Sequence, residues 1–175
     1  MSALNKMMGY LGLVDTDEEA LDVIKEFLSY MPAHHKQAPP VYPVPKDSGS
    51  QMTNILDLLP EKRTQVYDVR KVIQAIVDTG SYFELKPRFG KVLVTALTRL
   101  NGYSVGIIAN NPLVKGGAMD TEACEKATNF IVMCDSFNIP IVIGDKAVGV
   151  LTVADTKIGL YREEEMTILY KITQI

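Results

Sequence analysis

The chain has 175 residues, 47% of them hydrophobic and 22% charged, which is the balance of an ordinary globular protein and not of a disordered one. This length accommodates one well-buried domain, or one domain with a small appendage. A net charge of −3, without runs of Lys and Arg interleaved with aromatic residues, argues against nucleic-acid binding.

The sequence also gives no basis for a membrane, metal or redox role. No segment approaches the roughly 20 uninterrupted apolar residues of a membrane span, and the N-terminus turns acidic before a signal-peptide core could form, so we expect a cytoplasmic protein. His34 and His35 have no further ligand at zinc-like spacing. Cys124 and Cys134 should lie about 15 Å apart on one predicted helix, so we expect small buried residues and no disulfide.

The N-terminal part predicts a packing helix and then an extended connection. Thr16 followed by Glu19 forms a capping box ahead of an apolar helical stripe that stops at Pro32. From Pro32 to about Thr53, frequent prolines exclude regular helix and favour an extended, partly polyproline II segment.

A second helix and a β-hairpin follow. The helix is predicted from about Tyr67 to Thr79, with Gly80 as its C-cap, and a short strand is predicted around 82–85. Residues 92–100 and 103–109 are rich in β-forming residues, and Asn101 and Gly102 between them suit the positive φ of a two-residue hairpin turn.

The segment from Asn110 to Pro140 places a double glycine ahead of an amphipathic helix. Gly116 and Gly117 let the backbone approach a ligand closely, and the helix start adds unpaired N–H groups, an arrangement that suits an anion or a developing oxyanion. An ordinary glycine-rich loop is the alternative. The helix is predicted over 120–137 with Asp120 as N-cap, followed by a strand at 139–143. Its expected buried residues are Ala123, Ala127, Phe130, Ile131, Cys134 and Phe137.

The last part of the chain predicts a turn at Gly144 and Asp145, a strand at 148–153, and a terminal helix. Glu163, Glu164 and Glu165 head this helix, which runs through Ile175 and has an apolar face. The order of strands around this tail does not follow from the sequence.

Four segments resemble the carboxyltransferase (beta) subunits of biotin-dependent acyl-CoA carboxylases, such as propionyl-CoA carboxylase. They are EEALDVIKEFLSYMP, ILDLLPEKRTQVYDVRKVIQAIVDTGSYFEL, VTALTRLNGYSVGIIANNP and GGAMDTEACEKATNFIVMCDSFNIP, within residues 1–142. The resemblance implies an α/β fold that is part of a crotonase-like (ClpP/crotonase) ββα unit. From Ile141 the sequence resembles instead the last hairpin and C-terminal helix of a GAF domain, which implies a join between domains 1–142 and 143–175.

The carboxyltransferase resemblance implies carboxyl transfer from carboxybiotin to an acyl-CoA, with paired backbone donors in place of a nucleophilic side chain. Gly116, Gly117 and Ala118 are then the expected catalytic loop, and Asn110, Asn111 and Pro112 the expected cofactor-binding residues. Biotin would arrive on a biotin carboxyl carrier protein, and the chain would form a homo-oligomer.

Three features of the family are missing from the sequence: its first domain, a PGFLPG-like loop and a later glycine pair. We therefore expect an inactive fragment, with a chimeric scaffold or a GAF-like small-molecule sensor as alternatives. Cations at Arg63, Arg70, Lys71 and Arg88 could contact CoA phosphates. The interleaved Asp68, Asp78 and Glu84 favour a salt-bridged face.

Overall fold

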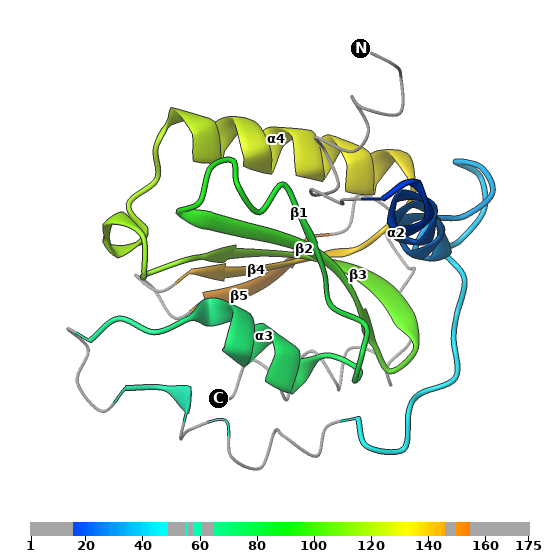
Figure 1. Cartoon of the computed structure of the whole chain (residues 1–175), viewed down its shortest axis with the longest axis horizontal. Helices are drawn as coiled ribbons and strands as arrows, with labels where there is room; N and C mark the ends of the chain where they lie inside the picture. Colours follow the sequence, from blue (N-terminus) through cyan, green and yellow to red (C-terminus); the bar gives the residue numbers. More distant parts are fainter. Residues whose placement is uncertain (1–15, 49–54, 56–57, 61–64, 146–149, 155–175) are drawn as a thin grey trace.

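The computed structural model describes residues 16–48, 55, 58–60, 65–145 and 150–154, and it builds one mixed sheet with helices on both faces (Figure 1). Five strands lie in the order β1-β2-β3-β4-β5, and all neighbours are antiparallel except β3 and β4, which are parallel. The strands are β1 (Phe83–Leu85), β2 (Leu93–Leu100), β3 (Tyr103–Asn110), β4 (Ile141–Asp145) and β5 (Val150–Ala154). The predicted α/β class is confirmed.

The central strands are buried on both sides because each face of the sheet is covered by a helix (Figure 1). α4 (Thr121–Ser136) packs on the face that carries Leu93 and Leu97, and α3 (Val69–Ile76) packs on the opposite face with Val94 and Leu100. This alternation along β2 explains why the strand reads as almost continuously apolar. The contact of α4 with β3 is close at Gly106, where a Cβ would lie 2.8 Å from the Cys134 sulfur.

The N-terminal helix and its capping box are confirmed, and the polyproline II conformation of the connection after it stays a prediction. α2 (Asp17–Ser29) begins with the expected capping box: the Thr16 hydroxyl accepts from the Glu19 N–H at 3.2 Å, and the Glu19 carboxylate accepts from the Thr16 N–H at 3.3 Å. The described part of the connection after α2, residues 32–48, contains no helix or strand beyond an isolated bridge between Val41 and Tyr103.

The second helix is shorter than predicted, and Gly80 is not its C-cap. α3 ends at Ile76, because Val77 is extended and buried in the core. Asp78 then turns inward, and its carboxylate accepts from the Asn101 N–H at 3.1 Å and from the Gly102 N–H at 2.7 Å. Gly80 instead occupies the turn after the helix, at φ 75°.

The hairpin and the long helix form as predicted. Asn101 and Gly102 both have positive φ, at 52° and 83°. Asp120 caps α4 by accepting from the Ala123 N–H at 3.0 Å. Two residues of α4 that were expected to be buried are not, since Ile131 is 42% exposed and Cys124 is exposed as well, whereas Cys134 is buried as expected.

The predicted turn at Gly144 and Asp145 is also wrong, because both residues belong to β4 and pair with Leu151 and Val150 of β5. β5 extends the same sheet. The predicted terminal helix at 163–175 lies outside the described residues, and the boundary between 142 and 143 stays a prediction. Among the helices that the structure describes, none has the length and hydrophobicity needed to span a membrane.

Candidate functional site

The candidate site is the loop that leaves β3 at Asn110 and leads into α4. Asn110 lies opposite Leu93 at the end of the β2–β3 ladder. Its side-chain amide donates a hydrogen bond to the Gly117 carbonyl at 2.9 Å, which closes the base of the loop. The sequence predicted a glycine loop here, but this clamp across seven positions was not foreseen.

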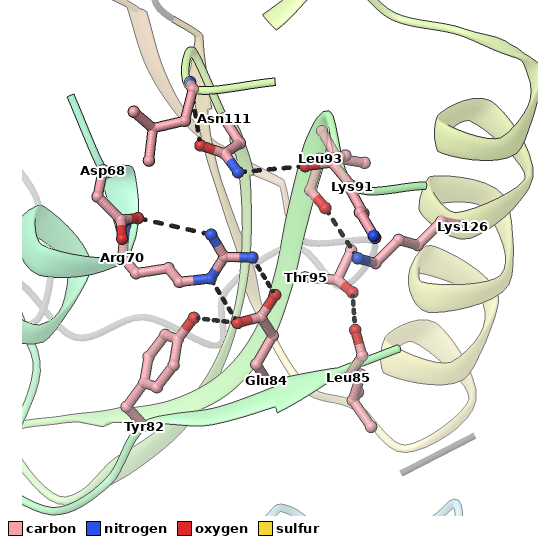
Figure 2. A network of polar contacts seen from close by, with 11 residues as sticks. Asp68, Arg70, Tyr82, Glu84, Leu85, Lys91, Leu93, Thr95, Asn111 and Lys126 are labelled. Carbon is pink, nitrogen blue, oxygen red and sulfur yellow. Dashed lines mark hydrogen bonds and ion pairs between the residues drawn. The ribbon is translucent and has the colours of Figure 1, made fainter. Parts of the chain in front are cut away.

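Asn111 and Pro112 anchor the loop in the protein interior, where both are almost fully buried. The Asn111 N–H donates to the Val92 carbonyl at 2.8 Å. Its side-chain amide donates to the Lys91 carbonyl at 3.2 Å and accepts from the Leu113 N–H at 3.3 Å (Figure 2). These contacts fix the loop to the start of β2, and a contact of Asn111 or Pro112 with a cofactor stays a prediction.

The two glycines do not form the pair of free N–H donors that was expected, because one of the two N–H groups is already hydrogen-bonded within the loop. Lys115–Gly117 forms a short 3-10 turn, in which the Gly117 N–H donates to the Val114 carbonyl at 2.9 Å and the Ala118 N–H to the Lys115 carbonyl at 3.2 Å. No described residue accepts from the Gly116 N–H. Gly116 is exposed at φ 65°, and nothing lies within 4 Å of where its Cβ would be. Gly116 is therefore an open donor of this turn, and the Lys115 N–H beside it likewise has no acceptor among the described residues.

A carboxylate already occupies the start of α4. Asp120 caps the helix and also receives a hydrogen bond from the Lys115 ammonium at 2.8 Å. Its pKa is lowered, first by the Lys115 ammonium and then by the Ala123 N–H. The positive end of the helix dipole is thus compensated within the chain, and the open donor lies ahead of the helix, in the turn itself.

A second polar cluster joins α3 to β1 (Figure 2). The Arg70 guanidinium donates to both carboxylate oxygens of Glu84, at 2.7 and 2.9 Å, and lies 3.5 Å from the Asp68 carboxylate. The Tyr82 hydroxyl donates to Glu84 at 3.0 Å, while burial and the Glu84 charge raise the pKa of this phenol. The predicted salt-bridged face is confirmed at Arg70, and Arg63 lies outside the described residues.

Lys126 is a buried charge that the sequence interpretation missed. Its side chain leaves α4 toward β2 and is 1% exposed, and the ammonium donates to the Leu93 carbonyl at 2.8 Å (Figure 2). Burial lowers its pKa to about 8. The signal was present in the sequence, because Lys126 falls between Ala123 and Phe130 at the spacing of the buried helical stripe.

Within the described residues, no group of three or more His, Cys, Asp or Glu side chains could hold a metal ion.

The chain is similar to carboxyltransferases over most of its length. The Carboxyl transferase domain family matches residues 8–158. The propionyl-CoA carboxylase carboxyltransferase subunit of Haloferax mediterranei is 41% identical over 128 residues, covering 73% of this chain and 25% of the relative. The methylmalonyl-CoA carboxyltransferase 12S subunit of Propionibacterium freudenreichii subsp. shermanii is 42% identical over 135 residues, covering 77% of this chain and 26% of the relative.

The solved structures that resemble this chain are also carboxyltransferases and carboxylases. A transcarboxylase 12S structure with methylmalonyl-coenzyme A and methylmalonic acid bound, described as a hexamer assembly, superposes with a TM-score of 0.68 at 42% identity. The superposed region comprises 73% of this chain and 25% of the transcarboxylase chain. A single-chain, multi-domain long-chain acyl-CoA carboxylase superposes with a TM-score of 0.62 at 33% identity, covering 91% of this chain and 14% of that one. The chain spans about a quarter of the length of the curated relatives named above.

Proposed function

Because the chain belongs to the Carboxyl transferase domain family, we propose that it supplies part of the site that moves a carboxyl group from carboxybiotin to an acyl-CoA. The observation that carries this proposal is the identity of 41% and 42% to two subunits that handle acyl-CoA thioesters. The crotonase-like fold assigned from the resemblance, biotin delivered on a carrier protein, and self-association belong to the same proposal. The hexamer assembly described for the transcarboxylase 12S subunit supports self-association.

In this chemistry the bound biotin supplies an activated carboxyl group, and oxygen atoms on both reactants gain negative charge. The chain's contribution is a hydrogen-bond donor that is held in place before the charge develops. The Gly116 N–H fits this role, because it is exposed and no described residue accepts from it. Gly117 and Ala118 form the frame of the turn, since their N–H groups are used within it.

Asn110 supports the same turn from the sheet. Its amide holds the Gly117 carbonyl at 2.9 Å, so the turn is tied to the end of β3 and cannot rotate its carbonyl toward the ligand side without losing this bond. Asn111 and Pro112, buried beside it, hold the loop against the start of β2. The residues predicted as cofactor-binding thus act, in this proposal, mainly by fixing the donor.

A hybrid enzyme tests the proposal. Residues 17–145 of this chain replace the matching segment in the Haloferax carboxyltransferase subunit, and transfer of labelled carboxyl to propionyl-CoA is measured. We expect the hybrid to be active. A backbone ester at Gly116, which removes its N–H, should slow transfer by about 3 kcal/mol in barrier, the usual cost of one oxyanion donor.

A backbone ester at Gly80 is the matched control, because Gly80 also has positive φ and nothing within 4 Å of its Cβ position. This control should keep full activity. Unchanged activity with the Gly116 ester would contradict the assigned donor, and a folded but inactive hybrid would contradict the proposed function.

The chain by itself should show no turnover, because it corresponds to about a quarter of its relatives. Decarboxylation of carboxybiotin above background with propionyl-CoA would contradict this expectation. Calorimetry against biocytin, CoA and cyclic nucleotides separates the remaining candidates. Binding of cyclic nucleotides alone would favour the GAF-like sensor. Binding of none of them would favour a scaffold.

A further inference from the structure

The start of β2 is held from two sides, and Lys126 supplies one of the contacts. The Lys91 carbonyl accepts from the Asn111 side-chain amide at 3.2 Å, and the Val92 carbonyl accepts from the Asn111 N–H at 2.8 Å. The Leu93 carbonyl, next along the chain, accepts from the Lys126 ammonium at 2.8 Å (Figure 2). Three consecutive carbonyls are thus used, two by the beginning of the candidate loop and one by the helix that follows it.

The Lys126 contact is one of two polar contacts that seat α4 on this segment. One turn earlier on the helix, the Glu122 carboxylate accepts from the Gly90 N–H at 3.4 Å. The backbones are close there, because a Cβ on Gly90 would lie 2.9 Å from the Glu122 carbonyl oxygen and 3.1 Å from the Ala123 Cα. Positions 122 and 126 are four apart and therefore share one face of the helix. The beginning of α4 is thereby fixed along residues 90–93.

The candidate loop therefore runs between two points that are fixed to the same short segment. It begins at Asn111, which is bound to two carbonyls just ahead of β2, and it ends at α4, which Lys126 ties to the first carbonyl of that strand. The first residue of β2 also lies opposite Asn110, whose amide holds the Gly117 carbonyl at 2.9 Å. Gly116 lies within this span, so the direction of its N–H depends on both ends being held.

An apolar side chain would fill the position of Lys126 at lower cost to the fold. The residue is 1% exposed, and none of the described carboxylates forms a salt bridge with it. Burying an ammonium without an ionic partner is costly. Hydrophobic residues of similar volume often replace even paired buried charges without loss of stability. The property of Lys126 that calls for a role is therefore its hydrogen bond, and not its contribution to the core.

We propose that Lys126 is a positioning residue, whose hydrogen bond to the start of β2 holds α4 in place and thereby fixes the Gly116 N–H for its ligand. The inference rests on the proposed function, in which Gly116 is a donor to a reacting oxygen. Lys126 itself does not touch a reactant in this role, because its ammonium is buried against the Leu93 carbonyl. It acts only through the placement of the turn, and misplacement by about 1 Å can slow a reaction by about a hundredfold.

The order of the Gly116 amide tests the positioning role without an activity assay. 15N relaxation is measured on the full 175-residue chain, on Lys126→Met and on Glu125→Met, which introduces the same residue at the adjacent, exposed position of α4. The order parameter at Gly116 should fall in Lys126→Met from about 0.85, typical of rigid backbone, to below about 0.6. It should not change in Glu125→Met, and the hairpin amides of Asn101 and Gly102 should not change in either variant. If Lys126→Met does not fold, Lys126→Gln, whose side chain is one atom shorter, gives the same comparison.

The hybrid enzyme tests whether the effect reaches the reaction. Lys126→Met should lower kcat about tenfold and leave the KM for propionyl-CoA unchanged, because a donor used in the transition state affects kcat. In the hybrid that carries the backbone ester at Gly116, the same substitution should have almost no further effect, since the donor is already absent. Glu125→Met should keep full activity.

Two results would overturn the positioning role. One is an order parameter at Gly116 that is the same with and without Lys126, and the other is equal slowing of the hybrid with and without the Gly116 N–H. An inactive hybrid would contradict the proposed function, and the relaxation comparison would still decide whether Lys126 positions the turn.

Discussion

β3 carries a glycine turn at each end, and the two turns differ in what their amides do. At the hairpin end, the N–H groups of Asn101 and Gly102 both donate to the buried Asp78 carboxylate, at 3.1 and 2.7 Å. At the other end, the Gly116 N–H has no acceptor among the described residues, and no atom lies within 4 Å of its Cβ position. Positive φ alone therefore does not identify a binding turn. The distinguishing observation is whether a side chain of the scaffold already uses the donors.

The largest effect on stability is expected at the closed turn. A Cβ on Gly102 would overlap the Tyr42 carbonyl oxygen, and the residue has φ 83°. Gly102→Ala should lower the free energy of unfolding by about 3 kcal/mol, combining the cost of left-handed backbone with overpacking. Urea unfolding followed by circular dichroism measures this loss. Gly80→Ala, which meets no atom within 4 Å, is the control and should lose only the backbone part. Equal losses would show that the hairpin tip is not tightly covered.

Asp78 should come next. Asp78→Ala removes the acceptor of two turn amides and should cost about 2 kcal/mol, because buried donors are left unpaired. Asp78→Asn keeps one acceptor oxygen and should lose less. Hydrogen exchange at the Asn101 and Gly102 amides should accelerate in both variants, and more in Asp78→Ala. Unchanged exchange would mean that the turn holds itself closed without the carboxylate.

The sequence predicted those features of the turns that depend on residues close together in the chain, and it missed those that depend on contacts between distant residues. Asn101 and Gly102 favour a hairpin turn by their own φ preferences, and Asp120 caps α4 three residues from the N–H that it accepts. The Asp78 clamp spans 23 positions to Asn101, so nothing local indicates it, and it lies where the sequence predicted helix up to Thr79 although α3 ends at Ile76. The same holds for the site, where the glycine turn was predicted but its closure by Asn110 was not.

Lys126 lies at the open end of the sheet, through its bond to Leu93, and should make stability there depend on pH. Burial lowers its pKa in the folded chain to about 8, below the value of about 10.4 for a free lysine. Between these values the unfolded chain binds more protons at Lys126, so this residue contributes a rise in the free energy of unfolding with pH, against the fall contributed by the buried Cys134 thiol, whose pKa is raised. Denaturant unfolding at pH 7 and pH 9.5 measures the change. Lys126→Met should lose this rise, whereas Lys91→Met, at an exposed lysine, should keep it. An identical pH dependence in all three chains would contradict the buried-charge interpretation.

Asn110 offers a smaller change at the open turn. Asn110→Ala removes one hydrogen bond, to the Gly117 carbonyl, and should cost about 1 kcal/mol in unfolding free energy. The same substitution should weaken carboxyl transfer in the hybrid enzyme more than it weakens folding, because the Gly116 donor loses its fixed position. A fall in activity that only matches the fall in folded protein would assign Asn110 a structural role alone.

The last comparison sets Gly116 against Gly80, an exposed glycine of positive φ in the turn after α3, and it should show a small effect on stability but a clear difference in activity. Gly116→Ala and Gly80→Ala both place a Cβ in open space at positive φ, so each should cost about 1 kcal/mol, and the two unfolding curves should nearly coincide. Their effects on the hybrid enzyme should differ. In the proposed site, a methyl group on Gly116 would crowd the approach of a ligand oxygen to the N–H, so transfer should fall while the Gly80 variant keeps its rate. Equal activity in both variants would mean that the open donor at Gly116 is unused, and that an accessible amide in a turn is no better a guide to function than its φ angle.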